Sequence, residues 1–91
     1  MSSLFCIGGY LVFLSNENNE PIHVHIVKGK PSPNTTKVWL TRAGQCIVAN
    51  SGSQIPQNDL NELLDVISAQ FFMICQKWKE HFKVEEIRFF C

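Results

Sequence analysis

Hydrophobic and polar residues follow a strand-like order in the first half of the chain. Residues 4–14 are apolar on both sides and contain Gly8-Gly9, which predicts a central strand interrupted by a bulge or a sharp bend. Residues 15–21 have the composition of a turn. Residues 37–41 and 45–49 are rich in β-forming residues and flank a short glycine-containing link, so they predict a hairpin.

In residues 22–27 apolar residues alternate with histidines as far as Ile26, and the segment predicts a further strand. His23 and His25 are two positions apart, so their side chains project from the same face, about 6.5–7 Å apart at Cβ. The opposite face carries Ile22, Val24 and Ile26, which we expect to face the core. Both imidazoles should therefore be presented outward, side by side.

The second half of the chain carries a helical repeat. Asp59 with Glu62 three residues later forms a capping-box pattern, which predicts the start of a helix. A helix running from there to Phe82 would be roughly 36 Å long. Residues 84–90 predict a last strand that returns to the sheet. The apolar stripe of this helix, at steps of three and four, consists of Leu60, Leu63, Leu64, Ile67, Phe71, Ile74, Cys75, Trp78 and Phe82.

Together these elements predict an α+β fold. An antiparallel four-stranded meander is packed by one long C-terminal amphipathic helix, which is followed by a final short strand. Ninety-one residues leave room for one core, so we expect residues 1–91 to form a single α+β domain. The hydrophobic fraction of 45%, with seven Phe, is ample for a packed interior.

Three patterns bear on location, on the state of the cysteines and on assembly. The sequence has no run of about 18 apolar residues and no secretory signal, so we expect a cytoplasmic protein that does not span a membrane. The four cysteines form no C-x-x-C pair and are predicted to be reduced thiols. Val66, Phe72 and Met73 flank the main helical stripe, and this surplus apolar surface predicts a homodimer.

The charge is unevenly distributed although its total is zero. A zero net charge produces no global attraction to nucleic acid or to an anionic membrane. No acidic residue occurs between Glu20 and Asp59, whereas several basic residues do. A chance distribution combined with helix-dipole preferences explains this segregation, and so does a face that binds an anionic partner. The candidate anion-binding or partner-binding residues are Lys28, Lys30, Lys37 and Arg42.

His23 and His25 are the candidate catalytic residues, because an imidazole that is near-neutral at cellular pH is suited to acid–base chemistry. A location on the solvated face of an amphipathic strand, with no chemical role, is the alternative. Two imidazoles on a rigid strand also need only a third ligand to hold a divalent metal. No spacing links His81, Glu17 or Glu20 to the pair, so no metal site is assigned. No phosphate loop or dinucleotide fingerprint occurs, so no cofactor is predicted.

Residues 19–26, Asn-Glu-Pro-Ile-His-Val-His-Ile, carry a likeness to a known family. They resemble the Pro-x-His-x-His strand of the bacterial and archaeal family called domain of unknown function 4160. The likeness includes Gly9-Tyr10 and a helix that closes on Trp78, and it spans most of residues 8–82. In this sequence Ile22 stands where a second Pro is frequent, and the preceding turn lacks the usual additional His.

The resemblance implies a small bacterial protein, and some family members are presumed components of toxin–antitoxin pairs. We therefore expect first an interaction component of such a pair. Its His-x-His strand and basic strip would bind an anionic partner, either a protein or RNA. One alternative is a ribonuclease-like enzyme, in which His23 or His25 is the acid or base and Lys28, Lys30 or Arg42 stabilises phosphate charge. The other alternative is a small metal-binding domain.

Overall fold

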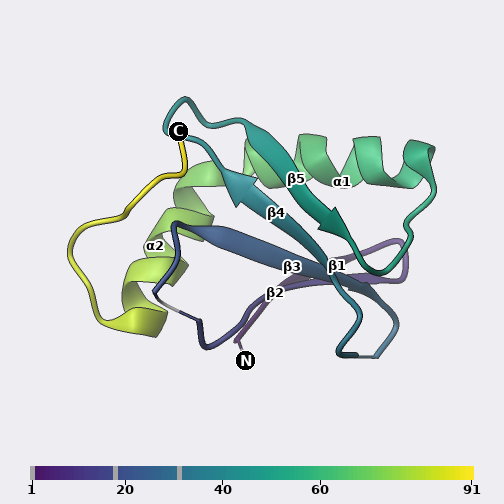
Figure 1. Cartoon of the computed structure of the whole chain (residues 1–91), viewed down its shortest axis with the longest axis horizontal. Helices are drawn as coiled ribbons and strands as arrows, with labels where there is room; N and C mark the ends of the chain where they lie inside the picture. Colours follow the sequence, from purple (N-terminus) through teal and green to yellow (C-terminus); the bar gives the residue numbers. More distant parts are fainter. Residues whose placement is uncertain (1, 18, 31) are drawn as a thin grey trace.

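The computed structural model describes residues 2–17, 19–30 and 32–91, and it shows an α+β architecture (Figure 1). The strands of the described chain form one antiparallel sheet, in which each strand pairs with the next one along the sequence. Two helices follow the strands and lie together on one side of the sheet (Figure 1). The elements are β1 (Ser2–Ile7), β2 (Tyr10–Leu14), β3 (His23–Lys28), β4 (Thr36–Leu40), β5 (Cys46–Ser51), α1 (Gln57–Ala69) and α2 (Phe71–Phe82).

The N-terminal segment forms two strands, so the predicted single strand over residues 4–14 and the four-stranded meander are wrong in this detail. Gly8-Gly9 is a two-residue hairpin turn between β1 and β2, in which Ile7 pairs with Tyr10. Both glycines have positive φ, +53° and +83°, which matches the turn type that joins twisted antiparallel strands most often. The glycines therefore reverse the chain instead of bending a continuous strand.

This turn gives a first testable prediction. Gly9→Ala should lower the free energy of unfolding by about 1–2 kcal/mol, because an alanine at φ +83° is strained. A Cβ at this position meets no atom within 4 Å, so the cost arises from backbone conformation and not from a clash. Chemical denaturation of the purified protein measures it. Gly8→Asn is the matched control: asparagine tolerates φ +53°, so this variant should stay within about 0.5 kcal/mol of the wild type. Equal losses in both variants would contradict the argument.

The strand with the two histidines and the hairpin after it are confirmed. Residues 23–28 form β3 at the centre of the sheet, and residues 36–40 and 46–51 form the hairpin of β4 and β5. The predicted turn over residues 15–21 connects β2 to β3, although residue 18 lies outside the described residues. The alternation in β3 also holds, because Val24 and Ile26 are fully buried in the core.

The helical region is two helices and not the predicted single one. The break lies at Gln70, whose backbone N–H is shared between the carbonyls of Val66 and Ile67 at 2.9 and 3.2 Å. A straight helix of roughly 36 Å would exceed the longest dimension of the molecule, 34 Å. The break lets α2 turn towards the end of the sheet where β3 begins (Figure 1).

The start of the first helix also differs from the prediction. Helix α1 begins at Gln57, after Pro56, and no side chain caps its first turn. Asp59 is thus inside the first turn, where its negative charge interacts favourably with the helix dipole. Its carboxylate accepts a hydrogen bond from the Tyr10 hydroxyl at 2.8 Å, which attaches α1 to β2. The contact raises the pKa of the Tyr10 phenol.

The C-terminal segment is not the predicted strand. Residues 84–90 have no regular structure and cross the ends of two strands. The Ile22 N–H donates to the Arg88 carbonyl at 2.9 Å, and the Arg42 N–H donates to the Cys91 carbonyl at 2.9 Å. Since these donors precede β3 and follow β4 respectively, the segment spans neighbouring strands and does not run beside one of them. This geometry prevents a continuous ladder.

The core lies between the helices and one face of the sheet. The helical residues of this core belong to the apolar stripe that the sequence predicts. Among the described residues, no helix is long and apolar enough to cross a membrane. All four cysteines are free, and burial raises the pKa of the Cys46 thiol to about 11. The buried core cluster consists of Tyr10, Val12, Leu14, Ile22, Val24, Ile26, Val38, Leu40, Leu63, Ile67, Ile74 and Trp78.

Candidate functional site

His23 and His25 lie side by side on β3, on the face opposite Val24 and Ile26. Their ring centroids are 5.1 Å apart with the rings nearly perpendicular. The prediction that they share a face is confirmed, but the expectation that they are presented outward to solvent is wrong. His23 is 1% exposed and His25 is 9% exposed. The pair is therefore a buried feature of the sheet.

Aromatic rings from distant parts of the chain cover the two histidines. In the sheet register His25 pairs with Phe13 of β2, and His23 pairs with Trp39 of β4. The Phe13 ring stacks on His25 at 5.5 Å, and Trp39 meets the edge of His23 at 5.4 Å. Trp78 of α2 approaches His23 at 5.5 Å. We call His23, His25 and these three covering residues the ring cluster.

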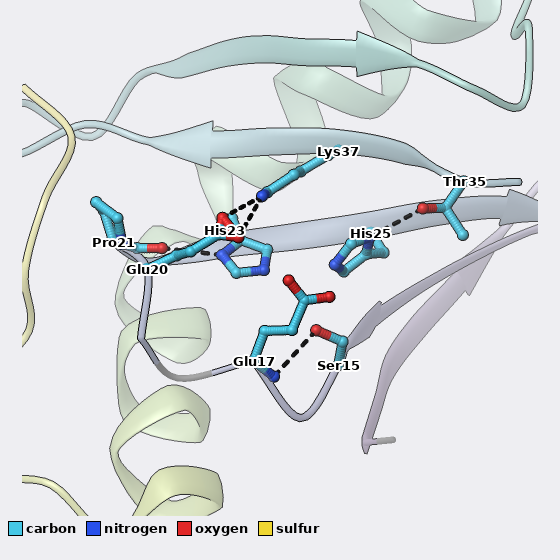
Figure 2. Close-up of polar contacts among 8 residues, drawn as sticks. All are labelled: Ser15, Glu17, Glu20, Pro21, His23, His25, Thr35 and Lys37. Carbon is cyan, nitrogen blue, oxygen red and sulfur yellow. Dashed lines mark hydrogen bonds and ion pairs between the residues drawn. The ribbon is translucent and has the colours of Figure 1, made fainter. Parts of the chain in front are cut away.

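Each imidazole is oriented by a hydrogen bond at Nδ1 (Figure 2). The His23 Nδ1–H donates to the Pro21 carbonyl at 2.9 Å, so the Nε2 atom of the neutral ring carries the lone pair. The His25 Nδ1 atom bonds the Thr35 hydroxyl at 2.9 Å. Both Nε2 atoms are buried, and neither has a hydrogen-bond partner among the described residues. On this face the acceptor Nε2 of His23 and the Nε2 atom of His25 are thus both left without a partner in the described chain.

Burial keeps both rings neutral. It lowers the pKa of His25 to about 4, with smaller contributions from His23 in its protonated form and from Lys37, against the carboxylate of Glu20. The pKa of His23 is also lowered, first by burial and then by Lys37, against the Pro21 carbonyl and two nearby carboxylates. A neutral imidazole is a base, a hydrogen-bond partner or a metal ligand, and it has no positive charge to attract an anion. The site therefore favours cations and donors over anions.

Carboxylates from the β2–β3 loop lie beside the rings. Glu20 forms an ion pair with Lys37, with Oε1 2.8 Å from Nζ, and this contact lowers the pKa of the Glu20 carboxyl. The Glu17 carboxylate points towards the space between His23 and His25 (Figure 2). Both glutamates are considered in the sequence analysis, but no spacing links them to the histidines. The fold of the loop is what brings their carboxylates close to β3.

The loop that carries these glutamates is held at its start. The Glu17 N–H donates to the Ser15 hydroxyl at 3.4 Å, a long contact, and the His81 Nε2–H donates to the Ser15 carbonyl at 3.0 Å. His81, at the end of α2, thus contacts the loop and does not join the histidine pair. As they stand, no three His, Cys, Asp or Glu side chains in the described residues are grouped to hold a metal ion.

The four predicted anion-binding residues are not brought together. Lys28 ends β3 and lies 5.9 Å from the centre of the Tyr10 ring, and Lys30 is exposed in the following turn. Lys37 is engaged by Glu20 and lies 4.5 Å from the centre of the Trp39 ring. Arg42 follows β4 at the opposite end of the sheet, 5.0 Å from the centre of the Phe89 ring. The basic residues are thus dispersed along the sheet.

A second surface surrounds the turn at residues 42–44. Phe72 is 85% exposed, Phe90 is 57% exposed and Ile47 is 38% exposed. The Phe90 ring stacks on Trp39 at 5.3 Å, and Ile47 is the register partner of Trp39. Two hollows meet at Arg42, one extending to Ile47 and the other to Phe72. We call Arg42, Ile47, Phe72 and Phe90 the turn surface; of these, the sequence singled out Arg42 and Phe72.

Comparison with known proteins identifies one family. A family model described as "Domain of unknown function (DUF4160)" matches residues 9–79 of the chain, more than half of its length. The match covers the histidine strand and ends just after Trp78. No curated protein and no solved structure matches the chain.

Proposed function

The chain belongs to the DUF4160 family, a domain family of unknown function, and we propose that it acts as an interaction protein that binds an acidic, apolar segment of a partner protein through its turn surface. The observation that carries this proposal is the exposure of Phe72. An aromatic ring that is 85% exposed, on a surface that carries two further exposed apolar side chains, is the composition expected at the centre of a protein interface.

The charges around the turn surface favour an acidic partner. Arg42 is the charged residue among the described residues that line the two hollows. Its side chain is exposed, and its guanidinium is available for bidentate binding of a carboxylate. An acidic side chain flanked by apolar ones would match Arg42 with Ile47 on one side and Phe72 on the other.

A protein partner fits this surface better than RNA does. RNA affinity rests on several cationic contacts to phosphates, and the four residues predicted to bind an anion are dispersed along the sheet. The zero net charge adds no general attraction to nucleic acid. Toxin–antitoxin-like pairing, which the family resemblance implies, would supply a partner of this kind, and we propose an acidic antitoxin-like protein.

Substitutions on the turn surface should weaken the complex without unfolding the chain. Phe72→Ser and Arg42→Glu are each expected to weaken partner binding at least about 30-fold, equivalent to about 2 kcal/mol, as for central residues of an interface. Because both side chains are exposed, thermal melting should change little. Co-purification from the native host identifies the partner, and titration calorimetry with the purified partner measures the affinity.

Lys30→Glu is the matched control, because it reverses an exposed positive charge at the other end of the sheet and should leave affinity within about twofold of the wild type. Equal binding by the wild type, Phe72→Ser and Arg42→Glu would contradict the proposal. So would nuclease-sensitive co-purification, which would indicate RNA. Self-association that depends on Phe72, seen by sedimentation, would instead identify a second copy of the chain, the predicted homodimer.

The catalytic role predicted for His23 and His25 stays a prediction. Neither residue lines any of the hollows described, and their free Nε2 atoms are covered. RNA cleavage by the wild type that disappears in His23→Gln and His25→Gln would support a ribonuclease. Absence of cleavage, or equal cleavage by all three proteins, would remove it.

A further inference from the structure

We propose that His23 and His25, together with the carboxylate of Glu17, form a binding site for a divalent transition-metal ion of the zinc class. The site lies on the face of β3 opposite Val24 and Ile26, and its three ligands are not part of the turn surface. Three features of the ring cluster and of the loop beside it support this site.

The first feature is the state of the two Nε2 atoms. Both are buried without a hydrogen-bond partner in the described chain, although His23 is 1% exposed and His25 is 9% exposed. A buried polar atom without a partner is unfavourable, because it has lost its hydrogen bond to water and gained none in the protein. A cation that accepts both lone pairs would satisfy them together.

The second feature is the orientation of the rings. Metal-ligating histidines almost always use their second nitrogen for a hydrogen bond, which fixes the tautomer. The Pro21 carbonyl does this for His23, and the Thr35 hydroxyl bonds Nδ1 of His25 (Figure 2). Aromatic neighbours further restrict both rings, since Phe13 stacks on His25 and Trp39 meets the edge of His23. The two ligand nitrogens are therefore oriented before any ion binds.

The third feature is the charge that faces the pair. Glu17 and Glu20 each bring a negative charge and Lys37 brings a positive one, all three from elements packed against His23. Their sum is one negative charge, which favours a cation. Glu20 is engaged by Lys37, which leaves Glu17 as the carboxylate that can turn onto the ion. Its carboxylate already points towards the space between the rings (Figure 2).

The identity of the ligands selects the class of metal. Two neutral imidazoles and one carboxylate suit Zn²⁺, Ni²⁺ or Cu²⁺, whereas Mg²⁺ and Ca²⁺ prefer oxygen ligands. The side chain of Glu17 must close over the rings to complete three protein ligands, because the three groups are not within ligand distance of one another as they stand. Three protein ligands would leave a fourth position for water.

Metal titration of the chain tests the proposal. The protein is purified without a polyhistidine tag, stripped with a chelator, and titrated with Zn²⁺ in competition with a chromogenic chelator. We expect one ion per chain. His23→Gln and His25→Gln should each weaken binding more than about 100-fold, because each removes a ligand, and Glu17→Gln should weaken it about 10-fold or more.

Controls separate this site from other binding. Phe72→Ser should bind Zn²⁺ as the wild type does, so the metal site and the turn surface can fail separately. A Cys6→Ser/Cys91→Ser variant removes the two exposed thiols and should also bind normally. If it loses the ion, or if Co²⁺ gives a thiolate charge-transfer band, the ligands are cysteines and the proposal is overturned.

A measurement on the wild type covers the case in which the histidine variants do not fold. In ¹⁵N imidazole NMR spectra, Zn²⁺ should shift the Nε2 resonances of His23 and His25 and leave those of His81 in place. No saturable binding, or saturable binding that leaves the His23 and His25 resonances unmoved, would overturn the proposal.

Discussion

Replacing Trp78 with alanine should lower the free energy of unfolding by about 3–5 kcal/mol, the usual cost of removing a large aromatic side chain from a core. Trp78 is 4% exposed and belongs to the main hydrophobic cluster. Its ring lies 4.4 Å from that of Phe82 and 5.5 Å from that of His23, so it joins the end of α2 to the start of β3. Guanidinium denaturation followed by far-ultraviolet circular dichroism measures the change.

Phe72→Ala, on the same helix, is the matched control for Trp78→Ala. The Phe72 side chain is 85% exposed, so its removal should change the free energy of unfolding by no more than about 0.5 kcal/mol. A loss for Trp78→Ala as small as that for Phe72→Ala would mean that α2 does not pack on the end of the sheet as described. This outcome would also remove one wall of the ring cluster.

The parts of the fold that the sequence predicts correctly are those set by local periodicity. Alternation in residues 22–27 identifies β3 and its core face, and a glycine-containing link between two β-rich runs identifies the hairpin of β4 and β5. The stripe that contains Leu63, Ile67 and Ile74 identifies the core face of the helices. In each case the element and its buried face follow from the pattern of apolar residues within one short segment. Residues that are near in sequence are therefore enough to predict them.

The errors concern features that depend on the whole molecule. The break at Gln70 has no proline or glycine to mark it, although a straight helix over the whole apolar stripe would be longer than the molecule. Residues 84–90 have the composition of a strand, but they cross the strand ends at Ile22 and Arg42. Gly8-Gly9 allows both a bulge and a hairpin turn, and only the pairing of Ile7 with Tyr10 distinguishes them.

The same division holds for the candidate site. That His23 and His25 share a face follows from their spacing alone. Their burial does not, because Phe13, Trp39 and Trp78 reach them from three other elements. The residues that would complete a metal site come from a loop whose path no spacing rule describes. The sequence therefore identifies the pair, whereas the fold determines that the pair is buried and neutral.

Burial of neutral histidine makes the stability of the metal-free protein dependent on pH. The pKa of His25 is about 4 in the folded chain, against 6.5 as its ordinary value. Between these values the unfolded chain binds a proton that the folded chain excludes, so stability falls as the pH falls below about 6.5. Lowering the pH from 7.5 to 5 should remove about 2 kcal/mol through His25, and the lowered pKa of His23 adds to the same trend.

Denaturation curves in the presence of a chelator, recorded at several values between pH 7.5 and 5, measure this dependence. The Glu20 carboxyl has a lowered pKa and contributes stability that is lost only below its ordinary value of 4.5, so it lies outside this window. His25→Gln keeps a polar side chain opposite Thr35 but cannot titrate, so its curve should be flatter by the contribution of His25. Phe72→Ala, which changes no titratable group, should keep the slope of the wild type. A wild-type stability that is constant over this range, or a slope unchanged in His25→Gln, would show that the imidazole is not held neutral by burial.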